Sequence, residues 1–253
     1  MSQPLLQVRD LVRHFAGVRA VDGVSLEIDA GQCVALIGPN GAGKSTLFAC
    51  LAGQQNPSSG QVLWAGRSLL GKSPRQRLEL GVGRSFQVAQ VFEALSVLAN
   101  VQLALQARSA SISAWQPLAI WQIEQAMALL EQAGLADLAG QIAGNLPYGA
   151  KKRLELAVVL AGQPRLLLLD EPAAGLAEQE RARLMAWVRS LVQQGLAVLY
   201  TEHNMDAVQG VADRVLVLIE GRLVAQGRFD EVAADPVVQA RYLGRLQGDM
   251  RHA

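Results

Sequence analysis

The chain has 253 residues, of which 51% are hydrophobic and 18% are charged, and its mean hydropathy is +0.19. This length and apolar content are enough for one α/β domain with an inserted subdomain, or for two small domains. The formal net charge of +1 gives no sign of a nucleic-acid partner or of an anionic membrane surface. The low charged fraction fits either a large core or an apolar surface that is kept for partners.

The cysteines and the apolar runs exclude several classes of protein. Cys33 and Cys50 lack the spacing of metal ligands, and we interpret them as small core residues of a protein in a reducing compartment. The first residues do not form a basic region followed by an apolar stretch, so no signal peptide is predicted. The longest apolar runs, such as 166–169 and 215–219, are too short to span a bilayer. If the protein serves a membrane, another chain crosses it.

Strands and helices are predicted to alternate over most of the chain. Gly17 and the pair Asp22 and Gly23 are turn signals between the first two strands. The continuous apolar run 33–37 is typical of a strand that is buried on both faces. Helices are predicted over 45–52 and 178–194. The predicted strands cover residues 5–15, 24–28, 33–37, 61–64, 166–169, 197–200 and 215–219. This alternation implies a parallel sheet.

A helical block interrupts the alternation between residue 96 and about residue 160. Its apolar residues recur at helical spacing in two groups, and residues 109–117 form a connection between them. The two groups are Val97, Leu98, Val101 and Leu105, then Ile123, Met127 and Leu130. We interpret the block as an inserted helical subdomain.

A glycine-rich loop follows the buried strand 33–37 and opens the helix after it. It has the pattern G-x-x-x-x-G-K-[ST], in which glycines let backbone N–H groups surround a phosphate at a helix N-terminus. Lys44 is predicted to reach the β- and γ-phosphates and Ser45 to coordinate Mg²⁺, with Thr46 beside it. The loop itself consists of Gly38, Pro39, Asn40, Gly41, Ala42, Gly43, Lys44 and Ser45.

Two carboxylates end the apolar run 166–169. The carboxyl end of a strand is where α/β sheets place ligand groups. We predict that Asp170 holds Mg²⁺ through water and that Glu171 polarises the attacking water. An apolar run that ends in Asp-Glu is weak evidence by itself, but it becomes strong downstream of a phosphate loop. Together the two motifs predict a P-loop nucleotide hydrolase.

A third motif narrows the family. The segment Leu146, Pro147, Tyr148 and Gly149, with the basic amphipathic helix after it, resembles the signature of ABC ATPases, Leu-Ser-Gly-Gly-Gln. The resemblance extends over nearly the whole chain. Gln87 matches the family's Q-loop, residues 174–177 fall at the D-loop, and His203 stands where the family has its switch histidine. Phe15 occupies the place of the aromatic residue that stacks on adenine.

The resemblance implies a fold and a map of the chain. The fold is α/β, with a P-loop NTPase (RecA-like) core of mainly parallel sheet, an N-terminal antiparallel β subdomain and an inserted α-helical subdomain. On this map, 1–253 is one ABC ATPase domain with a nucleotide-binding core at 1–90 and 161–230. The helical signature subdomain covers 91–160 and a helical tail covers 231–253.

The resemblance also implies a mechanism and partners. ATP and Mg²⁺ bind between two ATPase subunits, identical or different, and Leu146 to Gly149 act on the partner's nucleotide. Glu171, His203 and Gln87 are the expected catalytic residues, and Ser45, Gln87 and Asp170 the expected metal ligands. The chain would bind transmembrane permease subunits at the cytoplasmic face of the plasma (inner) membrane and act indirectly with an extracytoplasmic substrate-binding protein. No nucleic-acid partner is expected.

Several short segments resemble one branch of the ABC family. Residues 146–149, 170–176, 202–205 and 242–244 look like importers of branched-chain or hydrophobic amino acids, and 91–97 is also similar to urea and short-amide importers. Pro147, Ala150 and Ala177 depart from the family pattern. An importer of branched-chain or other small amino acids is therefore the expected function. A urea or short-amide importer, a non-transport ABC ATPase and a nucleotide-binding scaffold with low turnover remain alternatives.

Overall fold

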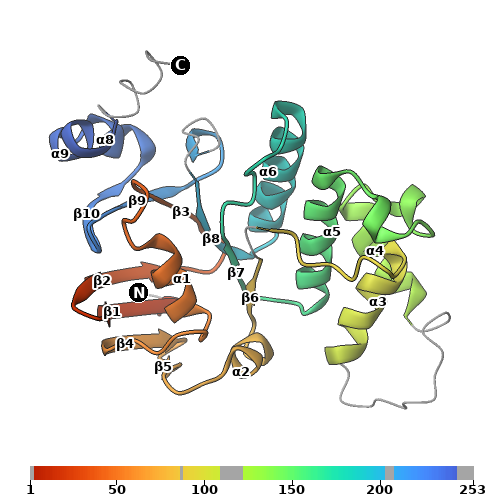
Figure 1. Ribbon diagram of the computed structural model, residues 1–253, viewed down its shortest axis with the longest axis horizontal. Helices are drawn as coiled ribbons and strands as arrows, with labels where there is room; N and C mark the ends of the chain where they lie inside the picture. Colours follow the sequence, from red (N-terminus) through yellow and green to blue (C-terminus); the bar gives the residue numbers. More distant parts are fainter. Residues whose placement is uncertain (1–2, 86–87, 109–121, 203–207, 244–253) are drawn as a thin grey trace.

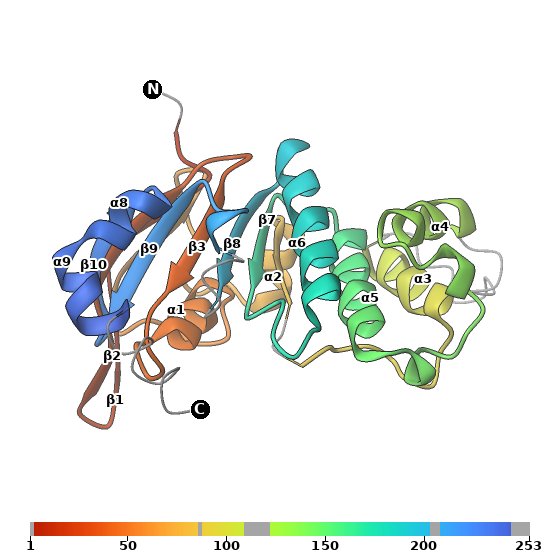
Figure 2. The same cartoon turned by 90° about the horizontal axis from the view of Figure 1, so that it is seen from above.

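The computed structural model describes residues 3–85, 88–108, 122–202 and 208–243. They form two sheets at one end of the molecule and a helical block at the other, with helix α6 between the large sheet and the block (Figures 1 and 2). This arrangement confirms the predicted α/β fold with a parallel sheet, an antiparallel sheet and an inserted helical block. Within the described residues, no helix is long and apolar enough to cross a bilayer.

The larger sheet has six strands in the order β10-β9-β3-β8-β7-β6, and only β10 runs antiparallel to its neighbour. Every residue of β3, β7 and β8 is buried. Helices and the second sheet cover its faces, which is why these strands are apolar throughout rather than at alternate positions. Its strands are β3 (Cys33–Ile37), β6 (Val82–Arg84), β7 (Leu166–Leu169), β8 (Ala197–Thr201), β9 (Arg214–Ile219) and β10 (Arg222–Gly227).

The second sheet is antiparallel, with the order β2-β1-β4-β5. Its strands are β1 (Leu6–Phe15), β2 (Val18–Ile28), β4 (Ser59–Trp64) and β5 (Arg67–Ser68). The prediction of a turn at Asp22 and Gly23 was wrong, because both residues lie within β2. The hairpin turns instead at Ala16 and Gly17, whose φ angles of 40° and 91° suit the tight turns that join antiparallel strands. The Asp22 carboxylate instead binds Arg222 and Arg19.

The core has two layers on opposite faces of the large sheet. One layer lies between the two sheets and includes α1 (Lys44–Leu51). The other lies under α6 (Glu178–Gln193) and α8 (Phe229–Ala234). Alternate residues of β3 supply the two layers: Val34 and Leu36 face the first, and Ala35 and Ile37 the second. Cys33 and Cys50 are buried free thiols, as predicted.

The helical block has its own apolar cluster. It contains α3 (Val97–Arg108), α4 (Ile123–Gln132) and α5 (Tyr148–Ala161), with short 3₁₀ turns at Ala136–Leu138 and Ala143–Asn145 between α4 and α5. The predicted connection at 109–117 lies outside the described residues. The remaining helical segments are α2 (Pro74–Glu79), α9 (Pro236–Val238) and a π-helical turn η4 (Gln239–Leu243).

Candidate nucleotide-binding site

The glycine-rich loop connects β3 to α1, at the carboxyl end of the buried strand. Two of its glycines are required by packing. A Cβ on Gly38 would lie 2.0 Å from the Leu218 carbonyl oxygen, and a Cβ on Gly43 would lie 2.0 Å from the Ala20 carbonyl oxygen. Gly41 differs, since a Cβ there would meet nothing within 4 Å. The loop is thus held tightly at both ends and is open at Gly41, where a ligand can approach the backbone closely.

Lys44 is buried, and its ammonium lies over the loop. Nζ donates to the carbonyl oxygens of Gly38 at 2.7 Å and Pro39 at 3.1 Å. Burial lowers the pKa of Lys44, while the negative charges of Glu171 and Asp170 act in the opposite direction. The lysine therefore lies close enough to both carboxylates to feel their charge.

The start of α1 suits an anion. Its N-cap is Gly43, and no side chain caps the helix. The N–H groups and the positive end of the helix dipole in the first turn can therefore be matched by a phosphate. Ser45 and Asn40 are exposed, Thr46 and Pro39 are half-buried, and Ala42 is buried. The structure thus places the predicted phosphate-binding residues together on one loop and one helix turn.

The carboxylates Asp170 and Glu171 follow β7 and are joined to the next strand by Thr201. The Thr201 hydroxyl donates to Asp170 Oδ1 at 2.9 Å, and the Glu171 backbone N–H donates to Thr201 Oγ1 at 2.9 Å. The guanidinium of Arg84, at the end of β6, lies 3.3 Å from the other Asp170 oxygen, Oδ2. Neither Thr201 nor Arg84 is predicted as a site residue from the sequence. The only signal for Thr201 is a polar residue at the end of a strand that is otherwise apolar.

The backbone of Glu171 is strained. Its φ angle is 48°, in the left-handed region that residues with a side chain rarely adopt. Such a conformation costs about 1–3 kcal/mol. It also occurs at six other non-glycine residues among those described, including Ala16 in the β1–β2 turn, so it does not by itself mark an active site. The hydrogen bond from the Glu171 N–H to Thr201 helps to hold this conformation. The backbone conformation at Glu171 therefore fixes the direction in which its side chain leaves the end of β7.

Mg²⁺ would find few protein ligands here. Among the described residues there is no group of three or more His, Cys, Asp or Glu that could hold a metal ion. Mg²⁺ commonly binds through one or two carboxylates together with phosphates and water. Asp170 is a buried carboxylate beside the loop lysine, and Ser45 is exposed at the start of α1. These two residues fit an ion that arrives with a nucleotide rather than one held by the protein alone.

The signature segment forms the start of α5. Pro147 is its N-cap, and the Pro147 carbonyl accepts the N–H groups of Ala150 and Lys151. Leu146 and Gly149 are buried, whereas Tyr148 is 41% exposed. In both ribbon views α5 lies across β7 from α1 (Figures 1 and 2). This separation agrees with a segment that acts on another subunit's nucleotide.

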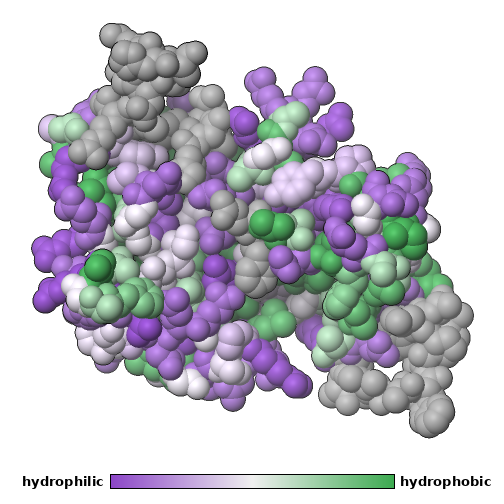
Figure 3. Space-filling view, viewed as in Figure 1, coloured by the Kyte–Doolittle hydropathy of each residue, from purple (hydrophilic) through white to green (hydrophobic). Residues whose placement is uncertain are grey.

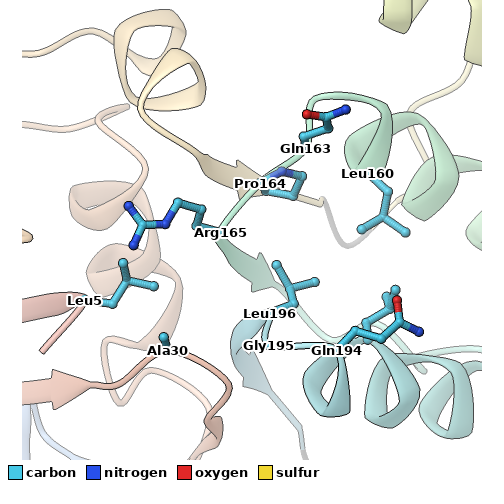
Figure 4. A pocket seen from close by; sticks show the side chains of 10 residues that line it. Leu5, Ala30, Leu160, Gln163, Pro164, Arg165, Gln194, Gly195 and Leu196 are labelled. Atoms are coloured by element: carbon cyan, nitrogen blue, oxygen red, sulfur yellow. The ribbon is translucent and has the colours of Figure 1, made fainter.

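Phe15 ends β1 and is 38% exposed. The Arg13 guanidinium carbon lies 4.5 Å from the centre of its ring and covers one face. Gln87 and His203, the other two predicted site residues, lie outside the described residues. The pocket in Figure 4 is a separate feature. Its lining includes Leu5, Arg165 and Leu196 near the starts of β7 and β8, the opposite end of these strands from Asp170.

Comparison with known protein families shows which family this chain belongs to. The model of the ABC transporter family matches residues 21–174, which include the glycine-rich loop, the signature segment and both carboxylates. The chain belongs to the ABC transporter family. It is therefore an ABC ATPase, and ATP is its nucleotide, as the resemblance in the sequence predicted.

Curated relatives match almost the whole chain. It is 38% identical to the branched-chain amino acid transport ATP-binding protein LivG of Salmonella typhimurium, covering 96% of this ABC ATPase and 99% of LivG. Identity and coverage are the same for LivG of Escherichia coli. The corresponding protein BraF of Pseudomonas aeruginosa is 35% identical, with 96% and 99% covered.

Solved structures agree. An ABC transporter cassette in its ADP conformation has a TM-score of 0.85 and 30% identity, over 96% of this chain and 99% of that one. A nucleotide-free cassette gives a TM-score of 0.84 and 28% identity, over 95% and 99%. The individual roles of the site residues in this ABC ATPase remain predictions.

A Lys44→Ala variant is expected to lose most nucleotide affinity. The change removes the ammonium group that lies over the loop and donates to the carbonyl oxygens of Gly38 and Pro39. Each charged hydrogen bond that this group would make to a phosphate oxygen is worth about 1.5–3 kcal/mol. Calorimetric titration with ADP should show affinity at least about tenfold weaker. An unchanged affinity would remove Lys44 from the binding role.

Proposed function

We propose that this ABC ATPase powers an importer of branched-chain or other small amino acids. The observation that supports this best is the end-to-end match with LivG and BraF, at 35–38% identity over 96% of the chain. The proposal is also supported by a phosphate loop, a buried lysine and two carboxylates that follow β7, one strand away from β3 in the sheet.

In this mechanism two ATPase subunits face head to tail and enclose ATP between them. The loop N–H groups and Lys44 bind the phosphates, and Glu171 orients the attacking water. Gln87 and His203 complete the site. Mg²⁺, held by Ser45 and Asp170, would neutralise charge on the β- and γ-phosphates. Leu146 to Gly149 supply donors to the partner's nucleotide, and Phe15 offers its uncovered face to adenine. Positioning and charge compensation account for most of the catalysis.

Closure of the two subunits would drive the permease. ATP bridges the interface and stabilises the closed state, and its hydrolysis removes that bridge. The second subunit is either identical or a related ATPase. A substrate-binding protein outside the membrane would deliver the amino acid to the permease. The ATPase would lie at the cytoplasmic face of the plasma (inner) membrane, held there by the permease.

A groove between α2 and α3 is the docking site that we propose for the permease. It has a volume of about 990 Å³, and its apolar lining includes Leu78 and Leu80 beside α2 and Ala104 and Ala107 on α3. Figure 3 shows hydrophobic residues along the lower edge of the molecule, beside α2 and over the helical block. A short amphipathic helix of a membrane subunit would cover the apolar side chains of this groove. Val88 and Phe92, in the segment that joins β6 to α3, are 65% and 60% exposed and lie outside its lining.

The predicted map of the chain gives this coupling a physical basis. The nucleotide-binding core at 1–90 and 161–230 and the signature subdomain at 91–160 would move relative to each other. Most of the helical block has its own apolar cluster, but Leu156 of α5 belongs to the core cluster under α6, and Trp187 of α6 packs against both clusters. The described part of the tail, 231–243, packs on the core through Val232, Val238 and Tyr242. A permease helix seated between α2 and α3 would sense the relative position of the two units.

Urea or a short amide is the alternative cargo that the sequence supports. Residues 91–97 are similar to urea and short-amide importers, and an ATPase does not contact the cargo. Deletion of the gene, followed by uptake measurements with radiolabelled leucine and urea, tests the cargo directly. We expect leucine uptake to fall and to recover with the wild-type gene. Loss of urea uptake alone would favour the alternative, and unchanged uptake of both with a defect in lipid or drug export would contradict an importer.

A Gly149→Asp variant should abolish hydrolysis while binding of ATP to the monomer persists. In the closed dimer, the Gly149 backbone approaches the partner's phosphate. Within the chain, a Cβ at this position would lie 2.4 Å from Glu180 Oε1, and a second carboxylate there would be repelled. Phosphate release and ADP titration measure the two properties separately.

The control for Gly149 separates packing from phosphate contact. Gly149→Ala should also impair hydrolysis. The Glu180 side chain can move away from the added methyl group, so the melting temperature should stay near that of wild type, and adding Glu180→Ala should leave it there. If the double variant regained full hydrolysis, close approach to phosphate would not be the reason for this glycine. Pro147→Ser, which adds a donor, should keep or raise activity.

A further inference from the structure

Arg84 is a half-buried cation at the nucleotide site that the proposed mechanism does not use. It ends β6, the edge strand next to β7, and its side chain is 13% exposed. Its Nη2 lies 3.3 Å from Asp170 Oδ2, and its Nη1 hydrogen-bonds to the Gln54 side-chain oxygen, just past the end of α1. Arg84 therefore connects the strand that carries the carboxylates to the helix that follows the phosphate loop.

The Asp170 carboxylate has a donor on each oxygen. Thr201 donates to Oδ1 at 2.9 Å, and Arg84 donates to Oδ2 at 3.3 Å. A cation that reaches Asp170, directly or through water, meets a carboxylate whose charge is already compensated by a guanidinium. An arginine does not lose its proton at any ordinary pH, so this compensation ends only if the side chain moves or the two cations share the oxygen.

We propose that Arg84 competes with Mg²⁺ for Asp170 Oδ2 and so sets the Mg²⁺ dependence of nucleotide binding. The inference rests on the proposed function, in which Asp170 is the metal carboxylate. In the nucleotide-free site Arg84 compensates the buried charge of Asp170. When nucleotide and Mg²⁺ bind, the guanidinium gives up this oxygen, and its hydrogen bond to Gln54 keeps it near the site. Arg84 is a positioning residue, since it acts through Asp170.

The size of the effect follows from Coulomb repulsion between the guanidinium and a cation at the same carboxylate. At about 4 Å and an effective dielectric constant of about 20, the repulsion between two unit charges corresponds to well over a tenfold change in affinity, and a divalent ion feels it more strongly. Loss of the charge should therefore strengthen the contribution of Mg²⁺ to nucleotide binding by about tenfold or more. A purely structural Arg84 would not change that contribution.

The test is calorimetric titration with ADP, which is not hydrolysed, once in EDTA and once in MgCl₂. The ratio of the two dissociation constants isolates the contribution of the metal. Arg84→Gln, which keeps a hydrogen-bond donor and loses the charge, should raise this ratio about tenfold or more. Arg84→Lys keeps the charge and should stay within about threefold of wild type.

The matched control is Arg189→Gln, which removes another arginine–aspartate pair. Arg189 lies on α6 and binds Asp213 at 2.7 Å, at the amino end of β3 and away from the phosphate loop. The ratio of the ADP dissociation constants in EDTA and MgCl₂ should be the same for Arg189→Gln as for wild type. Melting temperatures of all variants report folding separately.

An unchanged or lowered ratio in Arg84→Gln would overturn the inference, whatever its melting temperature. This failure is distinct from failure of the proposed function. If wild type and Lys44→Ala bound ADP equally, or not at all, the site itself would be wrong and the inference would fall with it. If ADP binding depends on Lys44 but the ratio of dissociation constants is the same in Arg84→Gln and wild type, only the competition between Arg84 and Mg²⁺ is refuted.

Discussion

A Glu171→Gln variant is expected to hydrolyse ATP about 100- to 10,000-fold more slowly than wild type while binding it normally. The amide has nearly the same shape as the carboxylate, so the strained backbone at φ 48° and its hydrogen bond to Thr201 are retained. The amide cannot accept a proton from water, which removes the general base from the transition state. Phosphate release under saturating ATP gives the turnover, and size-exclusion chromatography with ATP should reveal a longer-lived closed dimer.

The control for this prediction is Glu178→Gln, an identical substitution at an exposed position in the first turn of α6. Its turnover should match that of wild type. If Glu171→Gln retained more than about a tenth of wild-type turnover, the base would have to be sought elsewhere. Reduced binding of ATP in Glu171→Gln would instead indicate that the residue holds the loop in place.

An Arg77→Leu variant is expected to lose about 3–5 kcal/mol of unfolding free energy. Arg77 on α2 is 1% exposed, and burial lowers the pKa of its guanidinium. It donates to four carbonyl oxygens, those of Lys72, Leu69, Cys50 and Leu51. The last two belong to the end of α1, so the charge also meets the negative end of the phosphate-loop helix. Leucine would leave these buried acceptors without their donor.

Urea denaturation measures this loss, and Arg75→Leu is its control on the same helix. The Arg75 side chain is 87% exposed and pairs with Glu79 one turn later, so its removal should cost less than about 0.5 kcal/mol. If Arg77→Leu lost as little unfolding free energy as Arg75→Leu, α2 would tolerate both changes. The buried guanidinium would then have no special role in anchoring α1.

The elements that the sequence predicts well are those whose burial is uniform. The strands at 33–37 and 166–169 coincide with β3 and β7, because a strand covered on both faces carries an unbroken apolar run. The phosphate loop was predictable because its glycines and lysine act within eight consecutive residues. The short elements α2 and β6 carry no such pattern, since three to six residues are too few for a periodicity to emerge.

The polar contacts were beyond prediction for a different reason. Arg84 and Asp170 are 86 residues apart, Thr201 and Asp170 are 31 apart, and Arg77 and Cys50 are 27 apart. These pairs depend on which strands become neighbours, and one sequence does not reveal strand order. Asp22 illustrates the converse error. Asp followed by Gly favours a turn locally, but here the pair lies within β2, at a point where the register with β1 shifts and Gly23 has a φ of 72°.

The most direct test of the proposed motor is transport by the assembled complex. The ATPase, purified with the permease subunits that bind it, is reconstituted in proteoliposomes with ATP at the ATPase side and with leucine and the substrate-binding protein at the opposite side. Accumulation of leucine at the ATPase side is measured together with phosphate release. We expect leucine accumulation that requires ATP and disappears with either Lys44→Ala or Glu171→Gln. Accumulation that continues unchanged in both variants would contradict the view that ATP hydrolysis at this site drives import.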